Sequence, residues 1–235
     1  MPYAEAGDIR LYYEVHGSGD PLLLIPGLGS DSRFFRLLVP SLAERRQVLV
    51  VDPRGGGRSD KPPGPYSIGQ MARDVASLMR ELGIARAHVL GYSMGGKIAL
   101  QLAADRPELV DHLILGATAA RPPVTRRFSR RWLMVDVISR IPLWRGVDAQ
   151  PTYAFEAQRR ASAQFDGRPL LAKVTARTLI IRARRDHIVP PSATKELLAI
   201  PRSSLVDLPG GHITLVVLHG AQLAAAVSSF LESAP

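Results

Sequence analysis

The sequence predicts an α/β fold, a mostly parallel, doubly wound sheet of about eight strands. Short apolar runs alternate with segments of helical periodicity along most of the chain, which is the pattern of strand–helix units around a parallel sheet. The 235 residues, 46% of them hydrophobic, are enough for one large buried core and argue against disorder. The chain contains no cysteine, so the fold has no disulfide framework, thiolate metal site or cysteine nucleophile.

Eight short segments have the apolar character of strands and are bounded by turn-forming or charged residues. The first, at residues 3–5, is expected to be an edge strand that pairs with the second. The other seven are expected at residues 9–15, 21–25, 47–52, 87–90, 112–115, 178–182 and 204–207.

Five segments have helical patterns. In one of them Ile68, Met71, Val75 and Leu78 recur at helical spacing, which indicates the core face of a packed helix rather than a cofactor site. Another ends before Pro107, because the residue preceding a proline disfavours the helical conformation. The expected helices are residues 33–43, 68–82, 94–105, 192–199 and 222–233.

Residues 121–172 break the alternation, with five prolines, six aromatic residues and ten arginines against four acidic residues. We expect two or three short helices inserted as a cap or lid, while residues 1–120 and 173–235 form the core domain. Long insertions in compact domains are usually functional. Their apolar side chains can cover a site on the core, form a small core of their own, or do both. The aromatic residues are Phe128, Trp132, Trp144, Tyr153, Phe155 and Phe165.

The chain carries a formal net charge of +9, concentrated in the arginines of this insertion. Two interpretations remain open: a solvated arginine-rich surface, or attraction of anionic substrates or an acidic surface. The basic cluster has no nucleic-acid reader motif and no interleaved stacking residues, so no nucleic-acid partner is expected.

Several other classes are disfavoured by absent patterns. The glycine-rich segments at residues 55–59 and 91–96 lack the spacing of dinucleotide and phosphate-binding loops, and no His/Asp/Glu cluster has metal-ligand spacing. No cofactor or metal is therefore expected. The first ten residues lack the pattern of a secretory signal, and no apolar run approaches the length of a membrane span, so a cytoplasmic protein is expected.

The segment at residues 87–96 carries the most specific chemistry. An apolar run leads into Gly-Tyr-Ser-Met-Gly, and a helical segment follows. A serine on such a sharp strand-to-helix turn needs small neighbours and is lifted above the sheet edge near a helix N-terminus. We therefore expect Ser93 to be a nucleophile. The backbone N–H of Met94 and that of Leu28, in the glycine-rich loop after residues 21–25, would form an oxyanion hole.

A serine hydroxyl needs a general base, and His212 is the expected one. It follows two glycines in the loop after the last expected strand, where parallel sheets place reactive groups. Asp186 lies after the preceding strand and is expected to orient His212, whereas the competing position after residues 112–115 has no acid. His187, next to Asp186, is expected to be a structural residue or a rim residue rather than a second base. The remaining histidines, expected at the surface or in packing, are His16, His88, His112 and His219.

Together these residues resemble the α/β-hydrolase superfamily, and the matching blocks cover nearly the whole chain outside residues 121–172. They are residues 26–29, residues 52–60, the Ser93 turn, Asp186 with residues 188–190, and residues 211–212. Residues 9–96 are most similar to the 3-oxoadipate enol-lactonases and small carboxylesterases. Many members have histidine where this chain has Pro26 and Gly56.

The resemblance implies a serine hydrolase that cleaves small or medium carboxylic esters or lactones through an acyl-enzyme, without a cofactor. Two alternatives remain: a C–C bond hydrolase or thioesterase with the same triad, and a ligand-sensing protein with little turnover. An arginine of the insertion could pair with a substrate carboxylate. A homo-oligomer is compatible with the sequence.

Overall fold

The computed structural model describes residues 2–122 and 150–233, which contain one eight-stranded sheet in the order β1-β2-β4-β3-β5-β6-β7-β8. Strand β2 is antiparallel to its neighbours β1 and β4, and all later pairs are parallel. The predicted fold class is confirmed, and the expected strands lie within two residues of the observed ones. The strands are β1 (Tyr3–Ala6), β2 (Ile9–His16), β3 (Pro21–Ile25), β4 (Gln47–Val51), β5 (Ala87–Tyr92), β6 (Val110–Gly116), β7 (Arg177–Ala183) and β8 (Ser203–Leu208).

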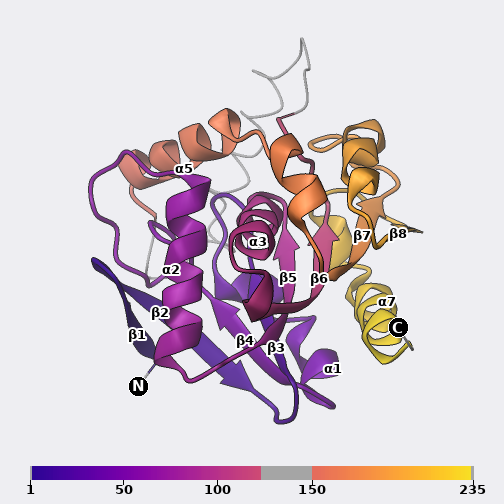
Figure 1. Ribbon diagram of the computed structural model, residues 1–235, viewed down its shortest axis with the longest axis horizontal. Helices are drawn as coiled ribbons and strands as arrows, with labels where there is room; N and C mark the ends of the chain where they lie inside the picture. The colour runs from indigo at the N-terminus through magenta and orange to yellow at the C-terminus, as the bar shows by residue number, and fades with distance from the viewer. Residues whose placement is uncertain (1, 123–149, 234–235) are drawn as a thin grey trace.

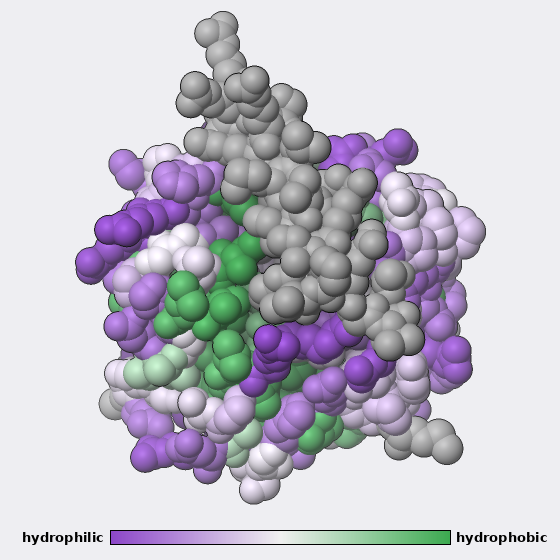
Figure 2. Space-filling view, turned by 180° about the vertical axis from the view of Figure 1, so that it is seen from behind, coloured by the Kyte–Doolittle hydropathy of each residue, from purple (hydrophilic) through white to green (hydrophobic). Residues whose placement is uncertain are grey.

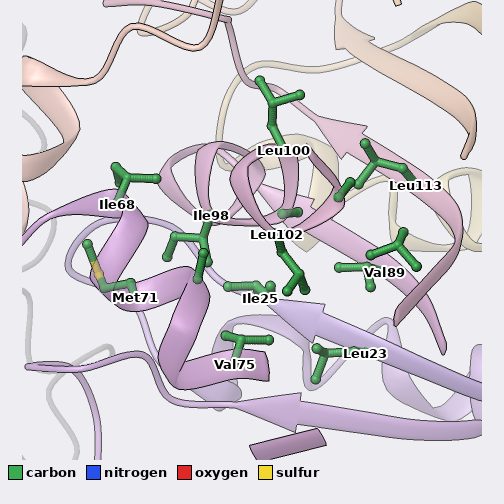
Figure 3. Close-up of a cluster of buried hydrophobic side chains, with 14 of the residues drawn as sticks. Leu23, Ile25, Ile68, Met71, Val75, Val89, Ile98, Leu100, Leu102 and Leu113 are labelled. Atoms are coloured by element: carbon green, nitrogen blue, oxygen red, sulfur yellow. The ribbon is translucent and has the colours of Figure 1, made fainter. Parts of the chain in front are cut away.

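One face of the sheet is covered by α2 (Ile68–Glu81) and α3 (Met94–Asp105), which lie side by side in front of it in Figure 1. Leu23 and Ile25 of β3 point to this face because side chains alternate along a strand. Figure 3 shows them against Val75 of α2 and Ile98 of α3, with the helical spacing of each apolar stripe turned toward the strands. The first turn of α2 is capped by the Ser67 side chain, which accepts a hydrogen bond from Gln70 N–H.

The other face is covered by α1 (Val39–Ala43), α6 (Thr214–Val217) and α7 (Gly220–Glu232). Leu22 and Leu24, the alternate residues of β3, lie in this second core. Figure 2 views the molecule from this side, where hydrophobic residues gather near the middle of a largely hydrophilic surface. Two cores, one on each face, hold the central strands fixed and leave the strand ends to carry loops.

Two helix predictions were wrong in kind. The segment at residues 33–43 is divided into a 3₁₀ turn, η1 (Ser32–Phe35), and the short helix α1. Pro40, in the first turn of α1, has no N–H to donate to the preceding turn, so one continuous helix would lose a hydrogen bond there. The segment at residues 192–199 is the 3₁₀ helix η4 (Pro191–Ala199), and a further 3₁₀ turn, η2 (Pro107–Leu109), follows α3.

Part of the expected insertion is described, and it contains α5 (Thr152–Gln164) and the 3₁₀ helix η3 (Arg168–Lys173). Figure 1 shows α5 at the end of the molecule toward which β5 and β6 point. Gln158 on α5 donates to the Arg54 carbonyl at 2.7 Å, and Tyr153 donates to the Lys61 carbonyl at 2.6 Å. The other expected features of the insertion, including Phe128, Trp132 and Trp144, lie outside the described residues.

The loop after β4 is built around the carboxylate of Asp52. Its two oxygens accept backbone hydrogen bonds from Ser32 at 2.6 Å and Arg58 at 2.8 Å, and the side chain is almost fully buried. Burial raises the pKa of Asp52 to about 6, although both N–H donors act in the opposite direction. The buried carboxylate thus joins two loops, and because its pKa is raised, its contribution to the free energy of unfolding depends on pH.

We expect the stability of the wild type relative to an Asp52→Asn variant to decrease as the pH rises through about 6. A folded-state pKa above the ordinary 3.8 means that the folded chain binds the extra proton between these values, so the free energy of unfolding falls as the pH rises. Urea unfolding of both proteins at pH 4 and pH 7 measures this. The difference, wild type minus variant, should be about 2 kcal/mol more favourable at pH 4, at about 1.4 kcal/mol per pKa unit. An equal difference at both pH values would contradict the prediction.

Candidate active site

Ser93 lies on the sharp turn between β5 and α3, as the sequence predicts. Its φ of +55° falls in the left-handed region, which a non-glycine residue seldom adopts. The Ser93 N–H donates a hydrogen bond to the Gly116 carbonyl at 2.9 Å, and the Ser93 carbonyl accepts a hydrogen bond from the Thr118 hydroxyl at 2.7 Å. Only glycine fits at position 95, because a Cβ there would lie 2.0 Å from the backbone oxygen of Ile25. The turn is therefore held in a strained conformation by its neighbours.

The structure brings Ser93, His212 and Asp186 together in one hydrogen-bonded chain. His212 Nε2 lies 2.9 Å from Ser93 Oγ, and His212 Nδ1 lies 2.7 Å from Asp186 Oδ2. The second oxygen of Asp186 accepts the backbone N–H groups of Ile188 and Val189, each at 2.8 Å. Asp186 is buried and both of its carboxylate oxygens are hydrogen-bonded, while Ser93 and His212 are partly exposed. A carboxylate so held can orient the imidazole and stabilise its protonated form.

Two further contacts hold the His212 loop, and the sequence did not indicate them. The buried Tyr92 hydroxyl donates a hydrogen bond to the His212 carbonyl at 2.6 Å, and the Gly211 N–H donates one to the Thr214 hydroxyl at 2.7 Å. Burial, together with the negative charge of Asp186, raises the pKa of Tyr92 well above its usual range. A tyrosine next to Ser93 at the end of an apolar strand gives no sign of this role, since its partner lies 120 residues away in the chain.

The glycine-rich loop after β3 runs directly beside Ser93. A Cβ on Gly27 would lie 3.1 Å from the Ser93 Cβ and 3.6 Å from its hydroxyl oxygen, so the backbone of this loop passes close to the serine. Leu28 is the next residue of this loop, and Met94 is the first residue of α3. The two predicted oxyanion donors therefore stand on the two backbone segments that flank Ser93.

A small cavity of about 40 Å³ opens beside Ser93. Its lining comes from the start of α3, from α5 and from the segments that follow β6 and β7. It is lined by Ser93, Met94, Lys97, Thr118, Ala119, Arg121, Pro122, Ser162, Ala163, Ile188 and Val189.

Lys97 is an unexpected charged residue in this lining. Its side chain is buried, and its ammonium donates to the Ser162 carbonyl at 2.7 Å and to the Ser162 hydroxyl at 3.1 Å. Burial lowers the pKa of Lys97 to about 8. Lys97 could not be singled out from the sequence, because helical periodicity does not show which lysine is buried by α5.

One group of residues with potential metal ligands lies at the opposite end of β5 from Ser93. His88, Asp111 and His112 place one ligand atom each within 4.8 Å of one another. The sequence did not reveal this group, because only the pairing of β5 with β6 brings residues 88 and 111 together. His88 is buried, and its Nδ1 lies 3.2 Å from Asp111 Oδ2, while Asp111 also pairs with His112 at 3.0 Å and with Arg86 at 2.9 Å. The arginine on the same carboxylate opposes the binding of a cation there.

A family model described as the alpha/beta hydrolase fold matches residues 20–139. The chain is 37% identical to a putative carbamate hydrolase RutD of Azorhizobium caulinodans, with 90% of this chain and 91% of the relative covered. The chain belongs to the α/β-hydrolase family. This confirms the resemblance drawn from the sequence.

Solved structures match this chain over nearly its whole length. The enol-lactonase of Burkholderia xenovorans LB400 matches with a TM-score of 0.83 at 28% identity, covering 99% of this chain and all of that one. A thermophilic esterase of Thermogutta terrifontis matches with a TM-score of 0.83 at 26% identity, covering 97% and 95%. The chain is accordingly an α/β-hydrolase-type hydrolase. Within residues 2–122 and 150–233, none of the helices combines the length and apolar character that crossing a membrane requires.

Proposed function

We propose that the protein is a serine hydrolase of small carboxylic esters or lactones, with Ser93, His212 and Asp186 as its catalytic triad. The observation that carries the proposal is the continuous chain of short contacts from the Ser93 hydroxyl through both imidazole nitrogens to a buried carboxylate. Nucleophile, base and orienting acid are then each within hydrogen-bond reach of the next.

In the first step Ser93 Oγ forms a bond to the substrate carbonyl carbon while its proton passes to His212 Nε2. Asp186 stabilises the imidazolium, and the carbonyl oxygen becomes an oxyanion held by the N–H groups of Leu28 and Met94. When the tetrahedral intermediate collapses, the bond to the alcohol oxygen breaks and His212 returns the proton to that oxygen. The acyl group remains on Ser93.

The second step repeats this chemistry with water. His212 removes a proton from the water as it attacks the acyl carbon, and then gives the proton back to Ser93 Oγ as the ester bond breaks. A lactone differs only in that the leaving alcohol stays attached to the acyl group.

We further propose that residues 121–172 form a cap over this site. Two described contacts support this: α5 supplies Ser162 and Ala163 to the cavity beside Ser93, and Arg121 and Pro122 line the same cavity. The cap would then select substrates by shape and polarity, while the core domain supplies the reacting groups.

A second candidate reaction is the hydrolysis of a carbamate. The putative carbamate hydrolase RutD of Azorhizobium caulinodans covers 90% of this chain at 37% identity, which is the observation in its favour. The small volume of the cavity beside Ser93 suits a short acyl group of either kind. Attack on a carbamate carbonyl uses the same nucleophile, base and oxyanion donors.

A substrate panel on the purified full chain separates these candidates. Methyl acetate, methyl butyrate, a five-membered and a six-membered lactone, a simple carbamate, an acyl thioester and a vinylogous C–C substrate are compared by kcat/KM. Ester or lactone turnover well above the carbamate supports the first proposal, and the reverse order supports the second. Thioester preference, or hydrolysis restricted to a vinylogous C–C substrate, would overturn both. Labelling of Ser93 by an organophosphonate without multiple turnover on any substrate would instead indicate a ligand-sensing protein.

A further inference from the structure

Lys97 is the charged group of the cavity that the proposed chemistry does not use. It lies four residues after Ser93 on α3, about one helical turn further from the nucleophile, and lines the same cavity. Only 8% of its surface is exposed. Lysine is rarely buried to this extent without a carboxylate partner, so this position requires an explanation.

The contacts of Lys97 leave part of its hydrogen-bonding capacity unused. An ammonium group carries three N–H donors. Two are taken by the carbonyl and the hydroxyl of Ser162, and no ion pair of Lys97 with an acidic residue occurs in the part of the chain that the structure describes. A buried charge with neutral partners alone is costly, and an apolar residue would pack α3 against α5 at lower cost.

The surroundings favour binding of an anion at this ammonium. Most of the cavity wall near it is apolar, including Met94, Ala163 and Val189, and electrostatic attraction is stronger in such surroundings than in water. Arg121 reaches the same cavity, but its guanidinium is already paired with Glu196 at 2.8 Å. Two further arginines of the insertion are also paired: Arg159 with Glu156 at 2.7 Å and Arg168 with Asp166 at 2.5 Å.

We propose that Lys97 forms a subsite for a carboxylate on the substrate, a few bonds away from the carbonyl that Ser93 attacks. The substrate class is then a half-ester of a short dicarboxylic acid, or a lactone with a free carboxylate. This proposal rests on the proposed function, and it assigns the anion-binding role to a buried lysine of the core helix rather than to an arginine of the insertion. The third N–H of Lys97 would donate to the carboxylate, while Ser162 holds the other two.

The test compares monomethyl glutarate with methyl hexanoate, which are similar in length and differ in the terminal carboxylate. Methyl-ester hydrolysis is followed by proton release for the wild type, Lys97→Met and Ser162→Ala. Methionine keeps the length of the side chain without its charge, and the Ser162 variant removes one hydrogen bond of Lys97 without removing its charge. We expect the wild type to prefer the glutarate ester about 10- to 100-fold in kcat/KM, as for a hydrogen bond to a charged group.

In Lys97→Met the preference should disappear, mainly through a raised KM for the glutarate ester, whereas Ser162→Ala should retain it. Equal losses on both esters in Lys97→Met would show a merely structural tie to α5 and overturn the proposal. Calorimetric binding of free glutarate to Ser93→Ala, with and without Lys97→Met, gives a readout that needs no turnover. Equal affinity of these two proteins for glutarate would also overturn the proposal, whereas loss of all ester hydrolysis with a Lys97-dependent affinity would count only against the proposed function.

Discussion

Replacing Ser93 by alanine should lower kcat on a short carboxylic ester by about 10⁶-fold, the loss expected when the nucleophile of the proposed triad is removed. Among the described residues, the Ser93 hydroxyl is the one hydrogen-bond partner of His212 Nε2, at 2.9 Å. Alanine keeps the Cβ of serine and adds no strain at this φ, so the free energy of unfolding should change by no more than about 0.5 kcal/mol. Initial rates and urea unfolding of the same preparation measure both quantities.

The matched control is Ser229→Ala, an exposed serine on α7, which should leave kcat and stability at wild-type values. Adding His212→Ala to Ser93→Ala should lower the rate little further, because the members of a triad act as a unit. Wild-type kcat in Ser93→Ala would refute the assigned nucleophile. A rate lost together with the fold would show that Ser93 is needed for structure instead.

Replacing Arg54 by alanine should reduce the free energy of unfolding by about 3–5 kcal/mol, the usual cost of breaking a buried ion pair from one side. The guanidinium is 2% exposed and forms two 2.8 Å hydrogen bonds with Asp74 on α2. It also bonds both carboxylate oxygens of Asp8, at 2.5 and 3.1 Å. Alanine would leave the buried carboxylate of Asp74 without its partner. Because Gln158 of α5 bonds the Arg54 carbonyl, the loop that supports the insertion should loosen as well.

Chemical denaturation and thermal unfolding of Arg54→Ala measure this loss, which should lower the melting temperature by roughly 6–20 °C for a chain of this size. Arg45→Ala is the matched control. Its guanidinium is 73% exposed and pairs with Glu232 at 3.2 Å, so the expected loss is about 0–1 kcal/mol. Equal losses of unfolding free energy in the two variants would show that burial does not determine how much these ion pairs stabilise the fold.

Local patterns in the sequence predicted those parts of the fold in which neighbours in the chain determine the conformation. The apolar run, the small residues around Ser93 and the helical spacing after it predicted β5, the turn and α3 with its observed bounds. The segment at residues 33–43 shows the limit, because apolar spacing indicated a helix there while Pro40 divides it. The prediction weighted periodicity above the missing N–H.

Contacts between distant residues could not be predicted in the same way. Nothing near Arg54 in the chain shows that Asp8 and Asp74 meet it, and nothing near Tyr92 shows that its hydroxyl bonds the loop of His212. Asp186 and His212 could be named because parallel strands end at a common edge, which converts position after a strand into position in space. No such rule applies to Lys97, because only the packing of α5 on α3 buries its side chain.

The most direct test of the proposed catalysis is the mass of the protein after brief mixing with a p-nitrophenyl ester and rapid quenching in acid, which traps any acyl group on the chain. We expect one acyl group per chain, located by fragmentation on Ser93, that forms in the wild type and is absent from His212→Ala. Turnover of the ester with no acyl group on Ser93, or with the group on another residue, would contradict the account.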